Sequence, residues 1–201
     1  MGKREVNSEF RVPSSELKHA VFLDRDGVIN ECKVIDGQPF PPLSVNEFVM
    51  LPNVARACRN LKQAGFILVV ATNQPDVGRG TLTQETVETI HGHMRSHLPI
   101  DRVEVCYHSG REVPECDCRK PKPGMLLRAA RELNIDLSAS WMVGDRWRDI
   151  DCGHAAGCRT VFIDYQYDET LRQQPDYRAR SLLEAAELIL NLELRKSGTG
   201  Q

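Results

Sequence analysis

Two aspartates, Asp24 and Asp26, directly follow a short apolar run, and their spacing suits chemistry on an anion. Residues two apart in an extended strand point to the same side, so the two carboxylates can come together. Carboxylates held this close repel each other unless a cation lies between them or one is protonated. A third carboxylate, Asp145, follows a later apolar run, and no His or Cys stands beside these residues. Because Mg²⁺ prefers oxygen ligands, the three positions predict a magnesium site.

Groups that could bind a phosphate follow other apolar runs. Thr72 with the backbone amides after it, and Lys120, offer hydrogen-bond donors and positive charge. The alternative is that such residues only form solvated loops at strand ends. That alternative could explain any one of these positions alone. However, polar candidates follow four apolar runs in a consistent order, and this favours a functional site. The neighbours that could contact the rest of a substrate are Asn73, Gln74, Arg119 and Arg146.

A second metal site is indicated by a cluster of cysteine and histidine. Cys106 and His108 are followed, seven residues later, by Cys116 and Cys118. Three thiolates and one imidazole complete a tetrahedral zinc set with no open position, which is typical of a structural site. The polar segment 109–115 between them lacks a core of its own, so we expect metal to fold it. The alternative is a set of unrelated buried thiols with a surface histidine.

Short β-rich runs alternate with helical patterns along the chain. This alternation predicts an α/β fold with a Rossmann-like parallel sheet covered by helices on both faces. Ligands bind such sheets beyond the carboxyl ends of the strands, which is where the polar candidates lie. Thr83 is expected to cap one helix and Gly65 to end another. The expected strands are 20–23, 66–71, 103–107, 141–143 and 160–163, and the expected helices are 54–64, 84–97, 124–133, 149–156 and 181–192.

The length and charge of the chain limit its organisation and its partners. With 201 residues it can bury about 70% of its unfolded surface, enough for one core. We expect a flexible segment over 1–17, a single domain over 18–195 that contains the zinc loop 106–118, and a flexible tail over 196–201. The net charge of −2 disfavours a protein that coats nucleic acid or a membrane. Seven cysteines and a polar N-terminus without a secretory signal predict a cytoplasmic location.

Four segments resemble the motifs of the haloacid-dehalogenase-like phosphatase superfamily, in the family's order. They are Phe22–Asn30, Ala71–Gln74, Lys120–Met125, and Val143–Arg146 with Asp149. The resemblance covers about residues 20 to 165. It implies that Asp24 attacks phosphorus and forms an aspartyl-phosphate, and that Asp26 acts as general acid and base. It further implies that Mg²⁺ is bound by Asp24, Asp145 and the backbone carbonyl of Asp26. Asp149 would orient a metal-bound water. Thr72 and Lys120 would hold the transferring phosphoryl group.

The zinc loop that runs into Arg119 and Lys120 resembles one branch of this superfamily. That branch contains the heptose-1,7-bisphosphate 7-phosphatases and the histidinol-phosphate phosphatases, which have a minimal cap. It implies a small phosphorylated sugar as substrate, with the 7-phosphate of the heptose as the group removed. The segment 31–42 reads ECKVIDGQPFPP and lacks the Asp-x-Gly-Tyr element common in the heptose enzymes. Histidinol phosphate therefore stays an alternative substrate, and a non-catalytic zinc-stabilised module stays an alternative function. The net negative charge disfavours a polynucleotide 3′-phosphatase.

Several other conspicuous residues are interpreted as structural. His91, His93 and His97 are assigned to a solvated helix face and Trp141 to the core. Trp147 follows Asp145 closely, and the sequence leaves open whether it lines the cleft. The segment 168–180 is interpreted as a solvated connection. The cysteines assigned to core or half-buried positions are Cys32, Cys58, Cys152 and Cys158.

Overall fold

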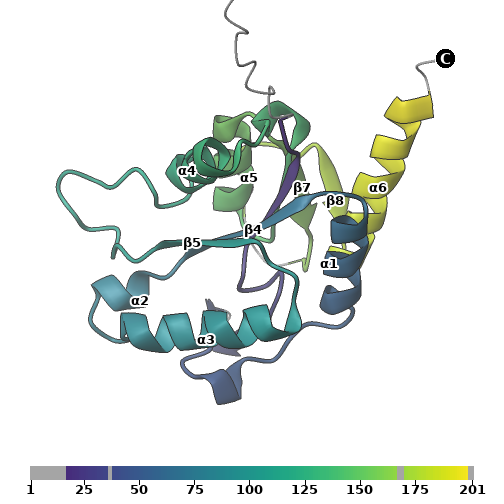
Figure 1. The fold of residues 1–201 in the computed structure, drawn as a ribbon. Helices are drawn as coiled ribbons and strands as arrows, with labels where there is room; N and C mark the ends of the chain where they lie inside the picture. Colours follow the sequence, from purple (N-terminus) through teal and green to yellow (C-terminus); the bar gives the residue numbers. More distant parts are fainter. Residues whose placement is uncertain (1–16, 36–37, 167–169, 199–201) are drawn as a thin grey trace, which may run out of the picture.

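A six-stranded parallel sheet forms the centre of the structure, a computed structural model that describes residues 17–35, 38–166 and 170–198 (Figure 1). The predicted flexible segment 1–17 lies outside the described residues except for Leu17. All neighbouring strands of the sheet are parallel. In spatial order they are β5 (Arg102–Cys106), β4 (Ile67–Asn73), β1 (Ala20–Leu23), β6 (Trp141–Gly144), β7 (Arg159–Ile163) and β8 (Tyr177–Ala179).

Helices cover both faces of this sheet. On one face α1 (Val54–Gln63) and α6 (Leu182–Gly198) lie against each other beside α3 (Gln84–His97), as Figure 1 shows. On the other face lie α4 (Gly124–Leu133) and α5 (Trp147–Ala156). The remaining helical turns are α2 (Pro75–Gly78), η1 (Val45–Glu47) and η2 (Leu137–Ala139).

The strands are apolar throughout because both faces of the sheet are buried. In β1, Val21 and Leu23 pack into the core under α1 and α6, whereas Ala20 and Phe22 pack into the core under α4 and α5. All four side chains are fully buried. Successive side chains in a strand point to opposite faces, so a central parallel strand needs apolar residues at every position. The predicted α/β architecture with helices on both faces is confirmed.

The chain order of the strands places a crevice at the carboxyl end of β1. From β1 the chain builds β4 and β5 on one side, then crosses to β6 on the other side of β1. A reversal of this kind opens a ligand site beyond the strand ends. Asp24, Thr72 and Asp145 come at or directly after the ends of β1, β4 and β6, so they meet there.

The predicted elements are found with small shifts at their ends, and several short elements were missed. The cap of α3 is as predicted, since the Thr83 hydroxyl accepts a hydrogen bond from the amide of Thr86. Gly65 directly follows the last turn of α1 with a positive φ of 90°, as predicted. The description of 168–180 as a solvated connection is wrong at Tyr177–Ala179, because this segment pairs with β7 as the edge strand β8. Helix α6 continues to Gly198, beyond the expected end.

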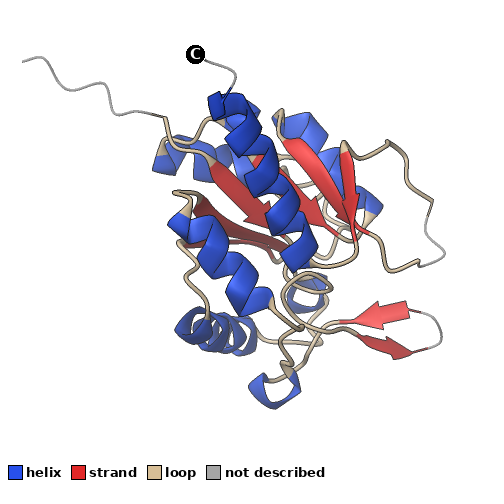
Figure 2. Ribbon diagram, turned by 90° about the vertical axis from the view of Figure 1, so that its right-hand side faces the viewer, coloured by secondary structure: helices blue, strands red, loops and turns tan. Residues whose placement is uncertain are grey.

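An antiparallel hairpin of β2 (Lys33–Ile35) and β3 (Gln38–Phe40) lies between β1 and α1. Figure 2 shows it projecting beyond the end of the large sheet. Among the described residues, this hairpin and η1 are the only elements between β1 and α1, in agreement with the expected minimal cap. No helix in the described ranges is long and apolar enough to cross a membrane.

Adjacent leucines on α4 test the packing of this helix against the sheet. Leu126 is fully buried, whereas Leu127 is 45% exposed. We expect Leu126→Ala to lower the free energy of unfolding by about 2–5 kcal/mol, because it removes buried methyl groups and leaves a cavity. The matched control Leu127→Ala should cost less than about 1 kcal/mol. Urea unfolding of both variants measures the difference, and equal losses would contradict the placement of α4.

Candidate functional site

Three carboxylates meet at the carboxyl end of the sheet. Asp24 follows β1, Asp145 follows β6, and Asp149 lies in the first turn of α5. One carboxylate oxygen from each lies within 4.8 Å of the others, and all three side chains are buried. Gly27 makes room for this group, since a Cβ there would lie 2.2 Å from an oxygen of Asp145. Its φ of 89° also favours glycine.

The ammonium group of Lys120 lies among these carboxylates. Its Nζ is 2.9 Å from Oδ1 of Asp24 and 2.6 Å from Oδ1 of Asp149. Burial acts to lower the pKa of Lys120, but attraction by Asp149 and Asp24 outweighs it and raises the pKa above its ordinary value. Lys120 therefore stays charged at neutral pH, and it joins the strand-end loop of β1 to the first turn of α5.

One ammonium does not balance three buried carboxylates. Burial raises the pKa of Asp24 to about 6, although Lys120 acts in the opposite direction. The pKa of Asp145 lies well above its usual value, because of burial and the nearby charges of Asp149 and Asp24. Carboxyls in this condition gain from a further cation. Their hard oxygen atoms and mutual distances fit Mg²⁺, and the assignment of Asp24 and Asp145 as its side-chain ligands stays a prediction.

Asp149 is held by two contacts that limit its freedom. Besides the ion pair from Oδ1 to Lys120, its Oδ2 accepts a hydrogen bond from the amide of Arg146 at 3.0 Å. Gly144 permits this approach, because a Cβ there would lie 2.1 Å from the Cβ of Asp149. Both oxygens of Asp149 thus have protein partners, and the residue positions Lys120. The expected role in orienting a metal-bound water stays a prediction.

The carboxylate of Asp26 lies outside the three-carboxylate group and accepts several hydrogen bonds. Gln74 donates to Oδ2 at 2.8 Å and Asn30 donates to Oδ1 at 3.0 Å. Arg25 donates from both Nε and Nη2, at 3.0–3.2 Å. The side chain of Asp26 is therefore engaged by donors, and among its oxygen atoms the backbone carbonyl is the one that the family resemblance assigns to the metal.

Arg25 and His91 were not singled out as parts of the site by the sequence. The Arg25 side chain is fully buried, and its Nη1 lies 3.1 Å from Nε2 of His91 on α3. The prediction that His91 lies on a solvated face is wrong, since this residue is only 2% exposed. Burial, together with the charge of Arg25, lowers the pKa of His91 to about 4. A neutral imidazole can accept from Arg25, which in turn holds Asp26.

The side chains at the end of β4 position the catalytic candidates. The Asn73 amide bonds the backbone of Lys120 twice, accepting from its N–H and donating to its carbonyl, each at 3.1 Å. Gln74 donates to the Thr72 hydroxyl at 3.0 Å as well as to Asp26. Asn73 also lines the cleft above the carboxylates, whereas Gln74 is buried beneath it. Their expected role in substrate binding stays a prediction, but both hold neighbouring site residues in place.

A cleft of about 340 Å³ opens over these groups. Asp24, Thr72 and Lys120 line its floor, and Phe40 and Pro41 approach it from the end of the hairpin. Arg119 and Arg146, both predicted to contact substrate, also line it. Trp147 is not among the lining residues and stacks instead with Arg172, whose guanidinium carbon lies 3.5 Å from the ring centroid. Trp147 therefore lies outside the cleft, a point that the sequence had left open.

The predicted zinc ligands converge at the loop after β5. Nδ1 of His108 lies 3.5 Å from Sγ of Cys106 and 3.3 Å from Sγ of Cys118. Sγ of Cys116 lies 3.8 Å from that of Cys106. Ligands of a tetrahedral zinc ion, at about 2.0–2.3 Å from the metal, are about 3.5–3.8 Å apart. The four side chains therefore fit zinc in number, chemistry and spacing.

Comparisons with known proteins agree on one family. The HAD-hydrolase-like family model matches residues 117–185. The D-glycero-β-D-manno-heptose-1,7-bisphosphate 7-phosphatase of Yersinia pestis is 40% identical over 154 residues, which cover 72% of this chain and 79% of the relative. The Pasteurella multocida protein of the same name is 33% identical over 189 residues, or 88% of this chain and 100% of the relative.

A solved structure shares the fold. The D,D-heptose 1,7-bisphosphate phosphatase from B. bronchiseptica, crystallised with magnesium and phosphate, aligns with a TM-score of 0.74 at 29% identity. The alignment covers 86% of this chain and 98% of that one. The corresponding Burkholderia thailandensis structure aligns with a TM-score of 0.61 at 28% identity, over 86% and 99% of the two chains.

Protons should compete with Mg²⁺ at the carboxylates. The pKa of about 6 for Asp24 means that the carboxyl is mostly protonated in the metal-free protein at pH 5 and mostly ionised at pH 7.5. Because the metal binds the ionised form, we expect its apparent affinity to fall about tenfold or more between these two conditions. Calorimetric titration with Mg²⁺ at several pH values measures this change. An affinity that is constant over the range would contradict the assignment of Asp24 as a ligand.

Proposed function

This chain belongs to the haloacid-dehalogenase-like family and is a phosphatase, and we propose that it removes the 7-phosphate of D-glycero-D-manno-heptose 1,7-bisphosphate in a Mg²⁺-dependent reaction. The names of the relatives support the substrate, since several are heptose-1,7-bisphosphate 7-phosphatases. The observation that carries the proposed chemistry is the Lys120 ammonium bridging the carboxylates of Asp24 and Asp149 beside Asp145.

Asp24 acts as the nucleophile in this proposal. Its Oδ1 is bound by the ammonium of Lys120 at 2.9 Å and by the amide of Arg25 at 2.7 Å. These contacts fix the rotation of the carboxylate, so that it meets phosphorus in one orientation. Attack forms an aspartyl-phosphate on Asp24 and expels the sugar alkoxide, and water then hydrolyses the intermediate.

Asp26 protonates the departing alkoxide and then takes a proton from the attacking water. The donors Gln74 and Asn30 keep its carboxylate beside the cleft during both steps. Magnesium, held by Asp24, Asp145 and the carbonyl of Asp26, would reduce the repulsion between the nucleophile and the phosphate dianion.

Thr72 and Lys120 hold the equatorial oxygens of the transferring phosphoryl group. Both line the cleft beside Asp24, and Lys120 carries a permanent charge at neutral pH. Positioning and charge stabilisation are the main contributions a protein makes to phosphoryl transfer. The two hydrogen bonds from Asn73 to the backbone of Lys120 support this positioning.

Histidinol phosphate is the second candidate substrate, because its hydrolysis would use the same catalytic residues. The segment 31–42 after the first motif supports this alternative, since it lacks the Asp-x-Gly-Tyr element common in the heptose enzymes. The arginines of the cleft favour the bisphosphate, because they attract a second phosphate and repel the amine of histidinol phosphate. A substrate panel with phosphate release as the readout distinguishes the two.

We also propose a structural zinc ion at Cys106, His108, Cys116 and Cys118, on the strength of their spacing. Its function is to fix the loop that leads directly into Arg119 and Lys120. A reducing compartment such as the cytoplasm, which the cysteine content predicts, is part of the same proposal. The absence of nucleic-acid and membrane partners remains part of the proposal.

Replacing the nucleophile tests the proposed chemistry. Asp24→Asn should abolish turnover with the fold intact, because the amide is a poor nucleophile and lacks the charge that binds Mg²⁺. The charge-matched control Asp101→Asn changes an aspartate at the amino end of β5 and should keep its activity. Measurements of kcat with Mg²⁺ and with excess EDTA provide the test. Undiminished turnover by Asp24→Asn, or by the chelated enzyme, would contradict the mechanism.

The zinc site is tested by elemental analysis. Protein purified without chelator should contain about one zinc ion per chain, and Cys116→Ser should lower this content, because a hydroxyl is a poor zinc ligand. Cys58→Ala is the matched control, since Cys58 is buried on α1 away from the cluster. Zinc-free wild-type protein, or an equal loss of zinc in both variants, would refute the site.

A further inference from the structure

The guanidinium of Arg25 contacts the carboxylate of Asp26 and the imidazole of His91, and these side chains are largely withdrawn from solvent. Arg25 is fully buried, His91 is 2% exposed, and the Asp26 side chain is 16% exposed at the edge of the cleft. A buried guanidinium is destabilising unless its N–H groups find acceptors. The position of Arg25 therefore depends on both of its neighbours.

Arg25 contacts both oxygens of the Asp26 carboxyl group. Its Nε and Nη2 donate to Oδ1 at 3.2 and 3.0 Å, and Nη2 also donates to Oδ2 at 3.0 Å. Because the contact uses both oxygens, it defines the plane of the carboxyl group. Gln74 and Asn30 each bind a single oxygen of Asp26, so neither fixes this plane by itself. The direction in which a proton reaches or leaves Asp26 therefore depends on where Arg25 lies.

His91 holds the side of the guanidinium that Asp26 does not contact. Nη1 of Arg25 lies 3.1 Å from Nε2 of His91. A guanidinium has only donors, so Nε2 is the acceptor and carries no proton. Burial and the charge of Arg25 lower the pKa of His91 to about 4, which keeps the imidazole neutral at neutral pH. Its one proton is therefore on Nδ1, which lies 3.8 Å from Oε2 of Glu88.

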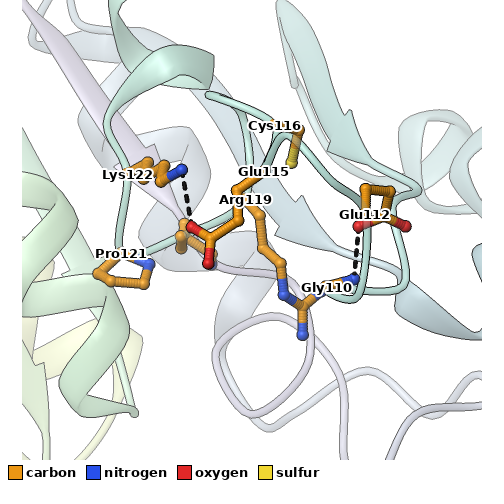
Figure 3. Close-up of a pocket in the computed structure, with 8 residues that line it drawn as sticks. Gly110, Glu112, Glu115, Cys116, Arg119, Pro121 and Lys122 are labelled. Carbon is orange, nitrogen blue, oxygen red and sulfur yellow. Dashed lines mark hydrogen bonds and ion pairs between the residues drawn. The ribbon is translucent and has the colours of Figure 1, made fainter.

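The helix that carries His91 is attached to the zinc loop one turn earlier. Glu88 stands three residues before His91 on α3, so both side chains project from the same side of the helix. The hydroxyl of Tyr107, at the start of the zinc loop, donates to Glu88. Figure 3 shows a later part of this loop, in which the amide of Gly110 donates to Glu112 at 2.9 Å. Helix α3 is therefore tied to the zinc loop at Glu88 and to the loop after β1 at His91.

We infer that His91 is a positioning residue for the proton transfers of Asp26, which it orients through Arg25. The inference rests on the proposed function and extends it to a helix outside the four motifs. In the first step Asp26 gives its proton to the sugar oxygen, while the bond from that oxygen to phosphorus breaks and the bond from Asp24 to phosphorus forms. In the second step Asp26 takes a proton from water, while the water oxygen bonds to phosphorus and the carboxylate of Asp24 leaves. Without an acceptor at position 91, Nη1 has no partner, and the guanidinium no longer holds the carboxyl group in one plane.

Two aryl phosphates with different leaving groups separate this role from a structural one. Nitrophenolate leaves phosphorus without a proton, whereas the more basic phenolate leaves faster when it receives one. His91→Met removes the acceptor and keeps a side chain of similar size. With Mg²⁺ present, it should lower kcat/KM for phenyl phosphate about tenfold or more, and for p-nitrophenyl phosphate less than about threefold. Because kcat/KM contains only the steps up to the loss of the leaving group, it reports the first proton transfer.

A loss of folded protein would lower both kcat/KM values by the same factor, so their ratio measures proton transfer alone. His91→Gln should return this ratio to within about threefold of the unaltered enzyme, because its amide oxygen can accept from Nη1. The control His97→Met makes the same substitution at an exposed position on α3 and should change neither value.

Equal losses on the two substrates in His91→Met, or a glutamine variant with the same altered ratio as the methionine variant, would overturn the inference and leave the proposed function standing. Hydrolysis of the aryl phosphates without hydrolysis of heptose 1,7-bisphosphate would refute the proposed substrate, while the aryl ratio would still decide the role of His91. No hydrolysis of any of these compounds with Mg²⁺ present would overturn both.

Discussion

The ion pairs of Lys120 are the interaction on which the rest of the site depends. One buried ammonium contacts Asp24 after β1 and Asp149 in α5, so it joins the two sides of the crevice beside the central strand. Removing one partner of a buried ion pair leaves the other charge uncompensated, and this lowers the stability of a protein by about 3–5 kcal/mol. The arrangement still has an excess of negative charge, and this excess is what makes the site suited to a metal ion.

Much of the surrounding structure keeps Lys120 and its partners in place. Asn73 binds the backbone of Lys120 from β4, and the zinc loop 106–118 ends two residues before Lys120. Gly27 and Gly144 leave the space that the carboxylates occupy. These contacts hold Lys120 and the carboxylates in defined positions, as a preorganised site requires.

The sequence predicted the large elements and the chemistry-bearing residues well, because both are encoded locally. Apolar runs predicted five strands of the sheet, and the Cys/His spacing predicted four side chains that do converge. Contacts between distant segments could not be read in this way. Asn73 and Lys120 are 47 residues apart, and β8 is a strand only because β7 lies beside it. His91 was placed in solvent, although Val87, Ile90 and Met94 mark its helix face as buried.

The central claim is that the phosphoryl group passes through Asp24, and it can be observed directly. Enzyme turning over heptose bisphosphate with Mg²⁺ would be quenched in acid and digested, and the peptides examined by mass spectrometry. The account predicts one added phosphoryl group on the peptide that contains Asp24, absent when the substrate is omitted. A phosphoryl group on any other residue would contradict it. So would turnover with no phosphorylated peptide in a quench fast enough to capture the first cycle.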